Sequence, residues 1–174
     1  MIYLITDTHL GHGKMVELCA RPANFSEKIK HNLDQLKSDD VLIHLGDVFW
    51  NSKAHDEVFL NTKFKKWLCL GNHDKASTGW FMSHGWDFVG TRIDLDVFGH
   101  KIALSHKPIP DDGWFDFNIH GHYHNIRVCC DRAPFLNEKH RLLSIEMSNY
   151  NPVRLDSIRR KDDKILKKSA EWIS

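Results

Sequence analysis

The chain has 174 residues, which is long enough to bury one substantial core and short for two domains. Its 24 basic and 23 acidic residues nearly cancel, so no overall field favours a nucleic-acid polymer or an anionic membrane as partner. The four cysteines form no Cys-x-x-Cys pair, which argues against a zinc ribbon or a thioredoxin-type motif. We therefore predict a single soluble domain, residues 1–174, located in the cytoplasm.

Short hydrophobic runs alternate with helical patterns in the first part of the chain. Residues 1–6 and 41–45 read as buried strands, and the first run stops at a polar residue long before it could span a membrane. Between them lies an amphipathic pattern, for which Ser26 is the expected N-cap. Its apolar face carries Ile29, Leu33 and Leu36. Strand, helix and strand in this order predict parallel strands joined by a right-handed crossover.

The same alternation continues along the chain. A helical pattern near 54–61 leads to a third strand near 64–70, and a loose segment follows that contains three aromatic residues, Trp80, Phe81 and Trp86. Alternating apolar residues then predict an antiparallel hairpin, and a shorter strand follows. These elements cover Ile93 to Val97, Ile102 to Leu104, and Phe117 to His120. Residues 141–147 are the expected last strand, and the tail from about Asp156 is expected to form a surface helix or a frayed end.

Polar side chains follow the end of each hydrophobic run. They are Asp7 and His9; Asp47; Asn72, His73 and Asp74; His106; and His122 and His124. Each group alone has a structural explanation, because an aspartate often caps a turn and alternate histidines can line a solvated face. Gly71 is expected to let the chain leave its strand sharply, since without a Cβ it can adopt backbone conformations closed to other residues. Ligands usually bind at the carboxyl ends of parallel strands, so a common site is the alternative.

The residue types in these groups suit metal binding. Carboxylates, an amide and imidazoles, without a thiolate, form a mixed nitrogen and oxygen ligand set that accepts Mn, Fe, Zn, Ni or Co. The set is larger than one ion needs. Two ions about 3.5–4 Å apart that share a carboxylate would use it fully.

In this pattern the chain resembles the calcineurin-like metallophosphoesterases. The blocks that carry the resemblance are Asp7-x-His9, Gly46-Asp47, Gly71-Asn72-His73-Asp74, His106 and Gly121-His122-x-His124, and they span roughly residues 1–150. The resemblance implies an α/β fold of two packed mixed β-sheets flanked by helices. It also implies that Asp7, His9 and His124 hold one metal ion and that Asn72, His106 and His122 hold the other. Asp47 would bridge the two ions.

The resemblance further implies a catalytic mechanism. Two divalent ions, manganese favoured and nickel, iron, zinc or magnesium as alternatives, would activate a water for in-line attack on phosphorus. His73, oriented by Asp74, would protonate the leaving oxygen or stabilise charge on the equatorial oxygens, without binding metal. The expected substrate is a small or nucleotide-type phosphodiester. A broad phosphomonoesterase and a non-catalytic scaffold of the same fold are the alternatives, a nucleic-acid polymer is not expected as partner, and the oligomeric state stays open.

Some residues outside the ligand blocks also deserve a hypothesis. The resemblance to small family members suggests that His12 touches the substrate phosphate, and Arg21 is a candidate substrate anchor. His44 is expected to be a hydrogen-bonded core residue, and His120 a packing or supporting residue. Four aromatic residues flank the motif loops and are candidates for stacking a nucleobase: Trp50, Trp80, Trp114 and Phe115. Protein phosphatases of this superfamily carry Asp-Arg-Gly after the Gly-Asp block, whereas Val48-Phe49-Trp50-Asn51 stands here, which disfavours that activity.

Overall fold

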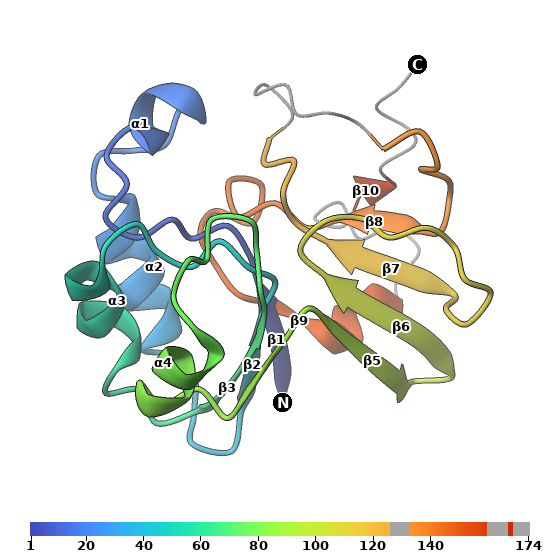
Figure 1. Cartoon of the computed structure of the whole chain (residues 1–174), viewed down its shortest axis with the longest axis horizontal. Coiled ribbons are helices and arrows are strands. Elements are labelled where there is room, and N and C mark those ends of the chain that lie inside the picture. The colour runs from blue at the N-terminus through green and yellow to red at the C-terminus, as the bar shows by residue number, and fades with distance from the viewer. Residues whose placement is uncertain (126–132, 160–166, 169–174) are drawn as a thin grey trace.

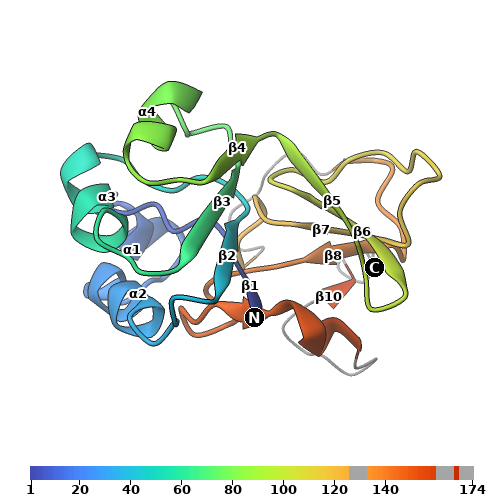
Figure 2. The ribbon, with the colours of Figure 1, turned by 90° about the horizontal axis from the view of Figure 1, so that it is seen from below.

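Two five-stranded β-sheets form the framework of the molecule, and the α-helices lie on the outer side of one of them (Figures 1 and 2). The computed structural model describes residues 1–125, 133–159 and 167–168. Both sheets contain parallel and antiparallel pairs. The predicted architecture of two mixed sheets with flanking helices is therefore confirmed.

The first sheet positions the three N-terminal ligand blocks. Its strands lie in the order β4 (Phe88–Gly90), β3 (Lys65–Cys69), β2 (Val41–His44), β1 (Ile2–Ile5) and β9 (Val153–Arg154). The first four are parallel and β9 is antiparallel to β1. Ile5 pairs with His44, and the backbone N–H of Asp7 donates to the carbonyl of Gly46 at 2.9 Å. The loops after β1 and β2 thus leave the sheet side by side, as the crossover rule predicts.

The described α-helices are α1 (Met15–Leu18), α2 (Phe25–Leu33), α3 (Ser52–Phe59) and α4 (Thr78–Ser83). The prediction for the start of α2 was wrong, because the helix begins at Phe25, whose buried side chain fixes the first turn, with Asn24 rather than Ser26 at the cap position. Helix α4 was missed. Its six residues include Gly79 and show little periodicity, although Ser77 does accept a hydrogen bond from the N–H of Trp80 at 3.1 Å. Among the described residues, no helix combines the length and apolarity that crossing a membrane requires.

The second sheet carries the histidines of the later blocks. Its strands lie in the order β10 (Lys167–Lys168), β8 (His140–Leu142), β7 (Phe117–His120), β6 (His100–Ser105) and β5 (Arg92–Val97). The antiparallel hairpin of β5 and β6 is confirmed, and β6, β7 and β8 are parallel.

The predicted last strand is shorter than expected. β8 ends at Leu142, and the chain then turns, with the N–H groups of Met147 and Ser148 both donating to the carbonyl of Ser144 at 3.1 Å. β9, β10 and a 3₁₀-helix at Leu155–Arg159 follow it. The expected helical or frayed tail therefore contains a strand in part, and its remainder, 160–166 and 169–174, lies outside the described residues.

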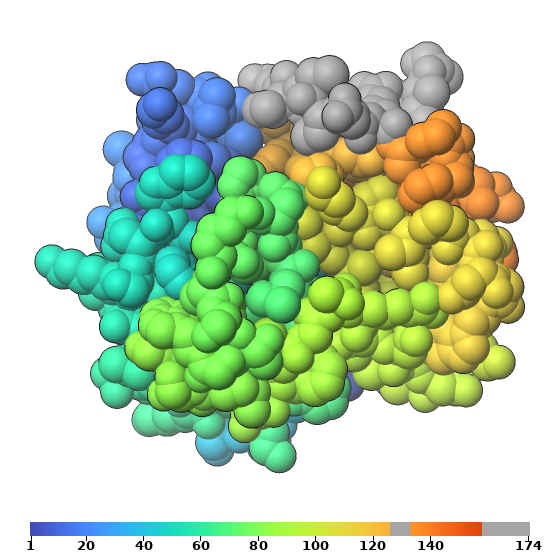
Figure 3. Space-filling view, viewed as in Figure 1, coloured from blue at the N-terminus to red at the C-terminus, as the bar shows by residue number. Residues whose placement is uncertain are grey.

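Three strands of the first sheet, β1, β2 and β3, bury side chains on both faces. Ile5, Leu42 and Leu68 belong to the core shared with the helices. Leu4, Ile43 and Cys69 belong to the core between the two sheets. Strands buried on both faces read as continuous apolar runs, so their polar groups can appear only beyond their ends. In the space-filling view the green part of the chain, around residue 80, lies between the blue and cyan N-terminal part and the yellow second sheet (Figure 3).

Candidate metal centre

The structure brings together all seven side chains predicted as metal ligands. The loops after β1, β2 and β3 supply Asp7, His9, Asp47 and Asn72, and the loops after β6 and β7 supply His106, His122 and His124. Ligand atoms of Asp7, His9 and His124 lie within 4.8 Å of one another, and so do those of Asp47, His106 and His122. These two clusters have the membership predicted for two neighbouring ions, with Asp47 in the second.

The backbone turns sharply at most of these residues. Five of the seven adopt positive φ angles: Asp7 at 50°, His9 at 44°, Asp47 at 58°, His122 at 72° and His124 at 47°. This left-handed conformation costs a non-glycine residue about 1–2 kcal/mol, and such strain concentrates at functional sites. The turns direct side chains from the ends of separate strands into one space.

Two glycines are needed at the site because other groups approach them closely. A Cβ on Gly71 would lie 2.2 Å from Oδ1 of Asp47, and one on Gly121 would lie 2.4 Å from Oδ2 of Asp7. The reason predicted for Gly71 was thus wrong, since its φ lies outside the left-handed region and the requirement is space for Asp47.

The first cluster leaves polar atoms without partners. Oδ2 of Asp7 accepts hydrogen bonds from the hydroxyl of Thr6 at 2.6 Å and the N–H of His122 at 3.0 Å. Its Oδ1 and both ring nitrogens of His9 are buried and make no hydrogen bond. Nε2 of His124 lies 3.8 Å from that Oδ1. Buried polar atoms rarely stay unpaired, so the convergence of a carboxylate oxygen and imidazole nitrogens fits a bound cation.

The second cluster points to the same conclusion through the tautomer of His106. Its Nδ1 lies 2.8 Å from the carbonyl oxygen of Leu45, which can only accept, so this nitrogen carries the proton. Nε2 is then unprotonated and carries a lone pair. It nevertheless lies close to two oxygen acceptors, 2.9 Å from Oδ1 of Asn72 and 3.4 Å from Oδ2 of Asp47. The lone pair and the two oxygens repel one another, and a cation between them would relieve that repulsion. These residues therefore fit a metal ion as well.

Asp47 lies between the two clusters. Its Oδ1 accepts the N–H of His73 at 2.8 Å. Its Oδ2 lies 3.6 Å from Nε2 of His9 and 3.4 Å from Nε2 of His106, one from each cluster. This is the position that a bridging carboxylate requires.

The electrostatics of the two clusters favour the binding of a cation. Burial, followed by the negative charge of Asp7, raises the pKa of Asp47 to about 6. Burial lowers the pKa of His9 to about 2 and that of His122 to about 4. Both imidazoles are therefore neutral, which is the form that binds metal. The raised pKa of Asp47 means that the positive charge nearby does not balance its buried carboxylate.

His73 and Asp74 differ in their roles at the site. The exposed ring of His73 belongs to neither ligand cluster and lies 5.6 Å, centre to centre, from that of His9. The carboxylate of Asp74 accepts the backbone N–H groups of Asp47, Val48 and Gly71 at 2.8 to 2.9 Å. Across the described ranges no hydrogen bond joins Asp74 to His73, so Asp74 does not make the contact expected to orient that ring. Its hydrogen bonds hold the backbone of the loop that carries Asp47.

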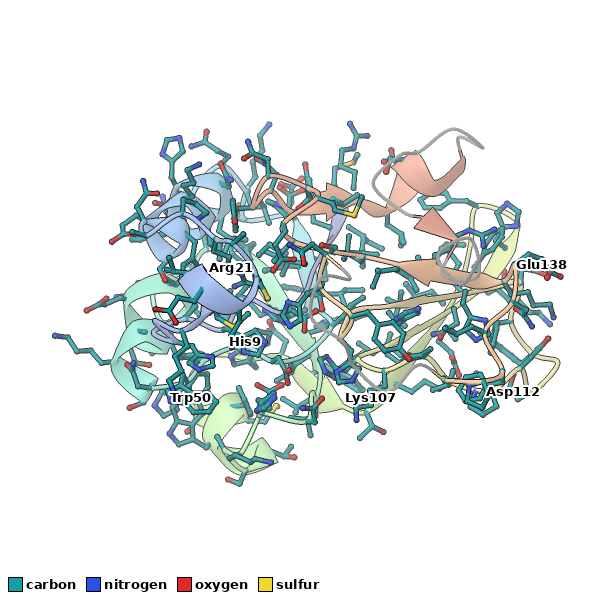
Figure 4. The ribbon with its side chains drawn as sticks, turned by 90° about the horizontal axis from the view of Figure 1, so that it is seen from above. His9, Arg21, Trp50, Lys107, Asp112 and Glu138 are labelled. Atoms are coloured by element: carbon teal, nitrogen blue, oxygen red, sulfur yellow. The ribbon has the colours of Figure 1, made fainter. Side chains whose placement is uncertain are left out.

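His12 lies at the mouth of the site, and its contact with a substrate phosphate stays a prediction. Its half-buried ring lies 5.9 Å from that of His9 and stacks on Trp50 at 4.1 Å and 8°. In Figure 4, His9 lies between Arg21 and Trp50, and Lys107 lies toward the second sheet. His12 and Trp50 thus border the first cluster.

Arg21 lies behind the site. Its side chain is fully buried and donates to the carbonyls of Asp7 at 2.7 Å and Thr8 at 3.0 Å, and to Oε1 of Glu146 at 2.7 Å. This position does not support the substrate-anchoring role expected for Arg21. It holds the backbone that carries the first ligand block.

Glu146 is a residue of the site that the sequence did not reveal. Its Oε1 lies 3.2 Å from Nδ1 of His124, and its Oε2 accepts the hydroxyl of Ser144 at 2.9 Å. No motif surrounds it, and it stood in a stretch predicted as a regular strand. Only the turn after β8 brings it to His124.

Two other histidines support the loops, as expected. Nδ1 of His44 accepts the N–H of Gly46 at 3.1 Å, and its Nε2 lies 2.9 Å from the hydroxyl of Thr8. His120 is also fully buried, with Nδ1 2.9 Å from the carbonyl of Gly121.

Comparison with known proteins agrees with this site. A sequence model of the calcineurin-like phosphoesterase family matches residues 1–173, and the chain belongs to that family. An uncharacterised protein of Methanocaldococcus jannaschii, MJ1445, is 30% identical over 172 residues, which cover 90% of this chain and 88% of that protein. The crystal structure of a protein of unknown function from Aquifex aeolicus, AQ665, aligns with a TM-score of 0.74 and 25% identity, over 91% of this chain and 97% of that one.

A more distant likeness concerns the fold alone. The nuclease MPE of Pseudomonas putida aligns with a TM-score of 0.50 and 24% identity, over 71% of this chain and 61% of that chain. Membership of the family makes this protein a metal-dependent hydrolase of phosphoesters, with the two clusters as its candidate metal ligands.

Proposed function

We propose that the protein is a dinuclear metal-dependent phosphodiesterase that acts on a small phosphodiester. Asp7, His9 and His124 would hold one ion, Asn72, His106 and His122 the other, and Asp47 both. The observation that supports this proposal is the convergence of carboxylate, amide and imidazole atoms in two clusters, of which Oδ1 of Asp7 and both ring nitrogens of His9 are buried without hydrogen-bond partners. Two divalent ions bound there, manganese being well suited to nitrogen and oxygen donors, would supply a nucleophilic hydroxide and neutralise charge on the phosphoryl oxygens.

In this proposal His73 handles the proton of the leaving group. Its backbone N–H is tied to Asp47, while its ring is exposed beside His9 and outside both clusters. An imidazole in this position can donate a proton to the ester oxygen that leaves, and such general acid catalysis contributes typically about 10²–10⁴-fold.

Space beside the second cluster favours a diester over a monoester. An open depression of about 290 Å³ adjoins the ligands Asn72 and His106 and continues over Thr91, Lys107 and Ile109. A phosphodiester has a second substituent that must lie somewhere next to the reacting phosphorus. The depression offers room for that substituent.

The experiment that tests the proposal uses protein stripped of metal and resupplied with Mn²⁺, Ni²⁺, Zn²⁺ or Mg²⁺. Hydrolysis of bis-p-nitrophenyl phosphate and p-nitrophenyl phosphate is compared for the wild type, Asp47→Ala and His73→Ala, with metal content measured for each. His31→Ala, at an exposed histidine of α2, is the matched control. We expect faster cleavage of the diester, loss of metal and activity together in Asp47→Ala, and full metal with about 100-fold or greater loss of turnover in His73→Ala.

Other outcomes would contradict parts of the proposal. Faster cleavage of the monoester would make the protein a phosphomonoesterase with the same ligands. One ion per chain in the wild type would exclude the dinuclear arrangement. Two bound ions without hydrolysis of either ester would favour a scaffold.

A further inference from the structure

Trp50 is an exposed aromatic residue at the mouth of the candidate metal centre. Its side chain is 55% exposed and belongs to neither hydrophobic core. Its indole stacks on His12 and lies 6.0 Å, centre to centre, from the ring of His73. Packing against His12 covers one face of the indole, so the exposed surface includes the opposite face. Folding of the core does not account for this position.

The stacked pair is held by the backbone rather than by side-chain packing alone. Leu10 and Phe49 form an isolated parallel bridge, and the N–H of Trp50 donates to the carbonyl of Leu10 at 2.8 Å. The N–H of His12 donates in turn to the carbonyl of His9 at 3.0 Å. These bonds connect the loops after β1 and β2, which also carry ligands of the candidate metal centre. The backbone segments that carry Trp50 and His12 are therefore held beside that centre.

The contacts of Gly11 restrict these loops further. Gly11 has a φ of 77°, and a Cβ on it would lie 2.1 Å from the side-chain nitrogen of Asn51. The same Asn51 caps α3 through the N–H of Ala54 at 2.9 Å. A preorganised aromatic surface of this kind loses little conformational entropy when a planar ring stacks on it.

The other aromatic residues proposed for stacking lack this combination. Trp80 is half-buried and stacks on His84 at 3.8 Å. Trp114 is half-buried with Arg92 and Lys101 over its ring, and Phe115 is only 2% exposed. Of the four candidates, Trp50 alone is both exposed and in ring contact with the site.

We propose that the exposed indole face of Trp50, backed by His12, binds the nucleobase of a nucleotide-type phosphodiester. This inference rests on the proposed function, because the phosphate of that ester must lie over the candidate metal ligands. A planar base stacks on an indole irrespective of its hydrogen-bonding groups, so the surface is expected to bind a nucleobase with little preference among the four bases. A free nucleotide and the terminal nucleotide of a strand both offer this chemistry.

The test measures binding and is independent of turnover. The probes are an uncleavable phosphonate analogue of adenosine monophosphate and its base-free ribose counterpart, titrated calorimetrically into Mn²⁺-loaded protein. The wild type should bind the analogue with the base about 5- to 150-fold more tightly, which is the range that base–aromatic stacking accounts for. Trp50→Ala should abolish that ratio, Trp50→Phe should retain most of it, and Trp114→Ala, the matched control, should leave it unchanged.

Two results would overturn the inference. They are equal binding of both probes by the wild type, and an equal weakening of both probes in Trp50→Ala. Hydrolysis of bis-p-nitrophenyl phosphate, measured in parallel, tests the proposed function separately. If the diester is cleaved but the two probes bind equally, only the inference about Trp50 is rejected. If the probe with the base binds more tightly but the diester is not cleaved, the proposed phosphodiesterase activity is rejected and the base site is kept. Single-stranded oligothymidylates of increasing length distinguish a free nucleotide from the terminal nucleotide of a strand. Affinity that rises with length indicates a strand.

Discussion

Oε1 of Glu146 lies 3.2 Å from Nδ1 of His124, while Nε2 of the same ring lies 3.8 Å from Oδ1 of Asp7. Burial opposes ionisation of Glu146, but hydrogen bonding to His124 and the charge of Arg21 lower its pKa to about 2. An ionised carboxylate that accepts the Nδ1 proton of a histidine orients the ring and makes its other nitrogen a better ligand.

We therefore expect Glu146→Gln to weaken metal binding about 10–100-fold, the range measured for such supporting residues. Glutamine preserves an oxygen that can accept from Arg21, so the fold should survive. Affinity is measured by competition with a chelator, and Glu57→Gln, at a residue whose side chain is 63% exposed, is the control. An affinity within twofold of the wild type would show that His124 needs no such support.

The close packing at Gly71 leads to a second prediction. The missing Cβ leaves room for Oδ1 and the backbone nitrogen of Asp47, which would lie 2.2 and 2.4 Å from a methyl group. Gly71→Ala must displace Asp47, and overpacking of this kind typically costs about 1–3 kcal/mol. We expect both a lower urea midpoint and a loss of bound metal. Gly13→Ala is the control, because a Cβ there meets nothing within 4 Å; equal stability of the two variants would contradict the argument.

Metal removal should destabilise the folded protein. Ions that bind only the native state stabilise it by about 2.7 kcal/mol when their concentration is 100 times Kd. Thermal unfolding of the wild type with and without chelator measures this difference. In Asp47→Ala the difference should shrink, since Asp47 contacts both clusters. The same melting temperature with and without ions would contradict the metal assignment.

His55 provides a prediction about pH. The residue is fully buried; Nε2 accepts from the indole N–H of Trp86 at 3.0 Å, and Nδ1 lies 2.9 Å from a carboxylate oxygen of Asp56. Burial lowers its pKa, and a second proton on Nε2 would face another donor. Because the native state disfavours the charged form, this stabilisation is complete above the unfolded pKa of about 6.5 and is lost as the pH falls below it.

His55→Gln keeps an acceptor for Trp86 and removes the titration. Its free energy of unfolding should therefore fall less between pH 7.5 and 5.5 than that of the wild type, as measured from urea midpoints. His31→Gln, an exposed histidine, should retain the wild-type difference. Parallel pH profiles for the wild type and His55→Gln would show that His55 is not the group responsible.

Local patterns in the sequence predicted most of the strands and the seven candidate ligand residues, and the resemblance to the family predicted the two-sheet architecture. Apolar runs marked the strands, and polar residues could stand only beyond their ends, as at Asp7 and Asp47. Residues whose role depends on distant contacts were missed or misread. Arg21 and Glu146 are 125 positions apart and meet only in the folded chain. Gly71 is required by the approach of Asp47, which no local pattern reports.

The positive φ angles at the candidate ligand residues lower the stability of the fold, whereas the side chains at these positions are the ones that the proposed activity needs. His122, at a φ of 72°, is half-buried, and an asparagine or glycine would adopt that conformation more readily. His122→Asn or His122→Gly should therefore cost the metal-free fold little, or even strengthen it, while removing a proposed ligand. Selection for thermal stability alone would erode these positions first, so the histidines and aspartates persist only while the chain is selected for its chemistry.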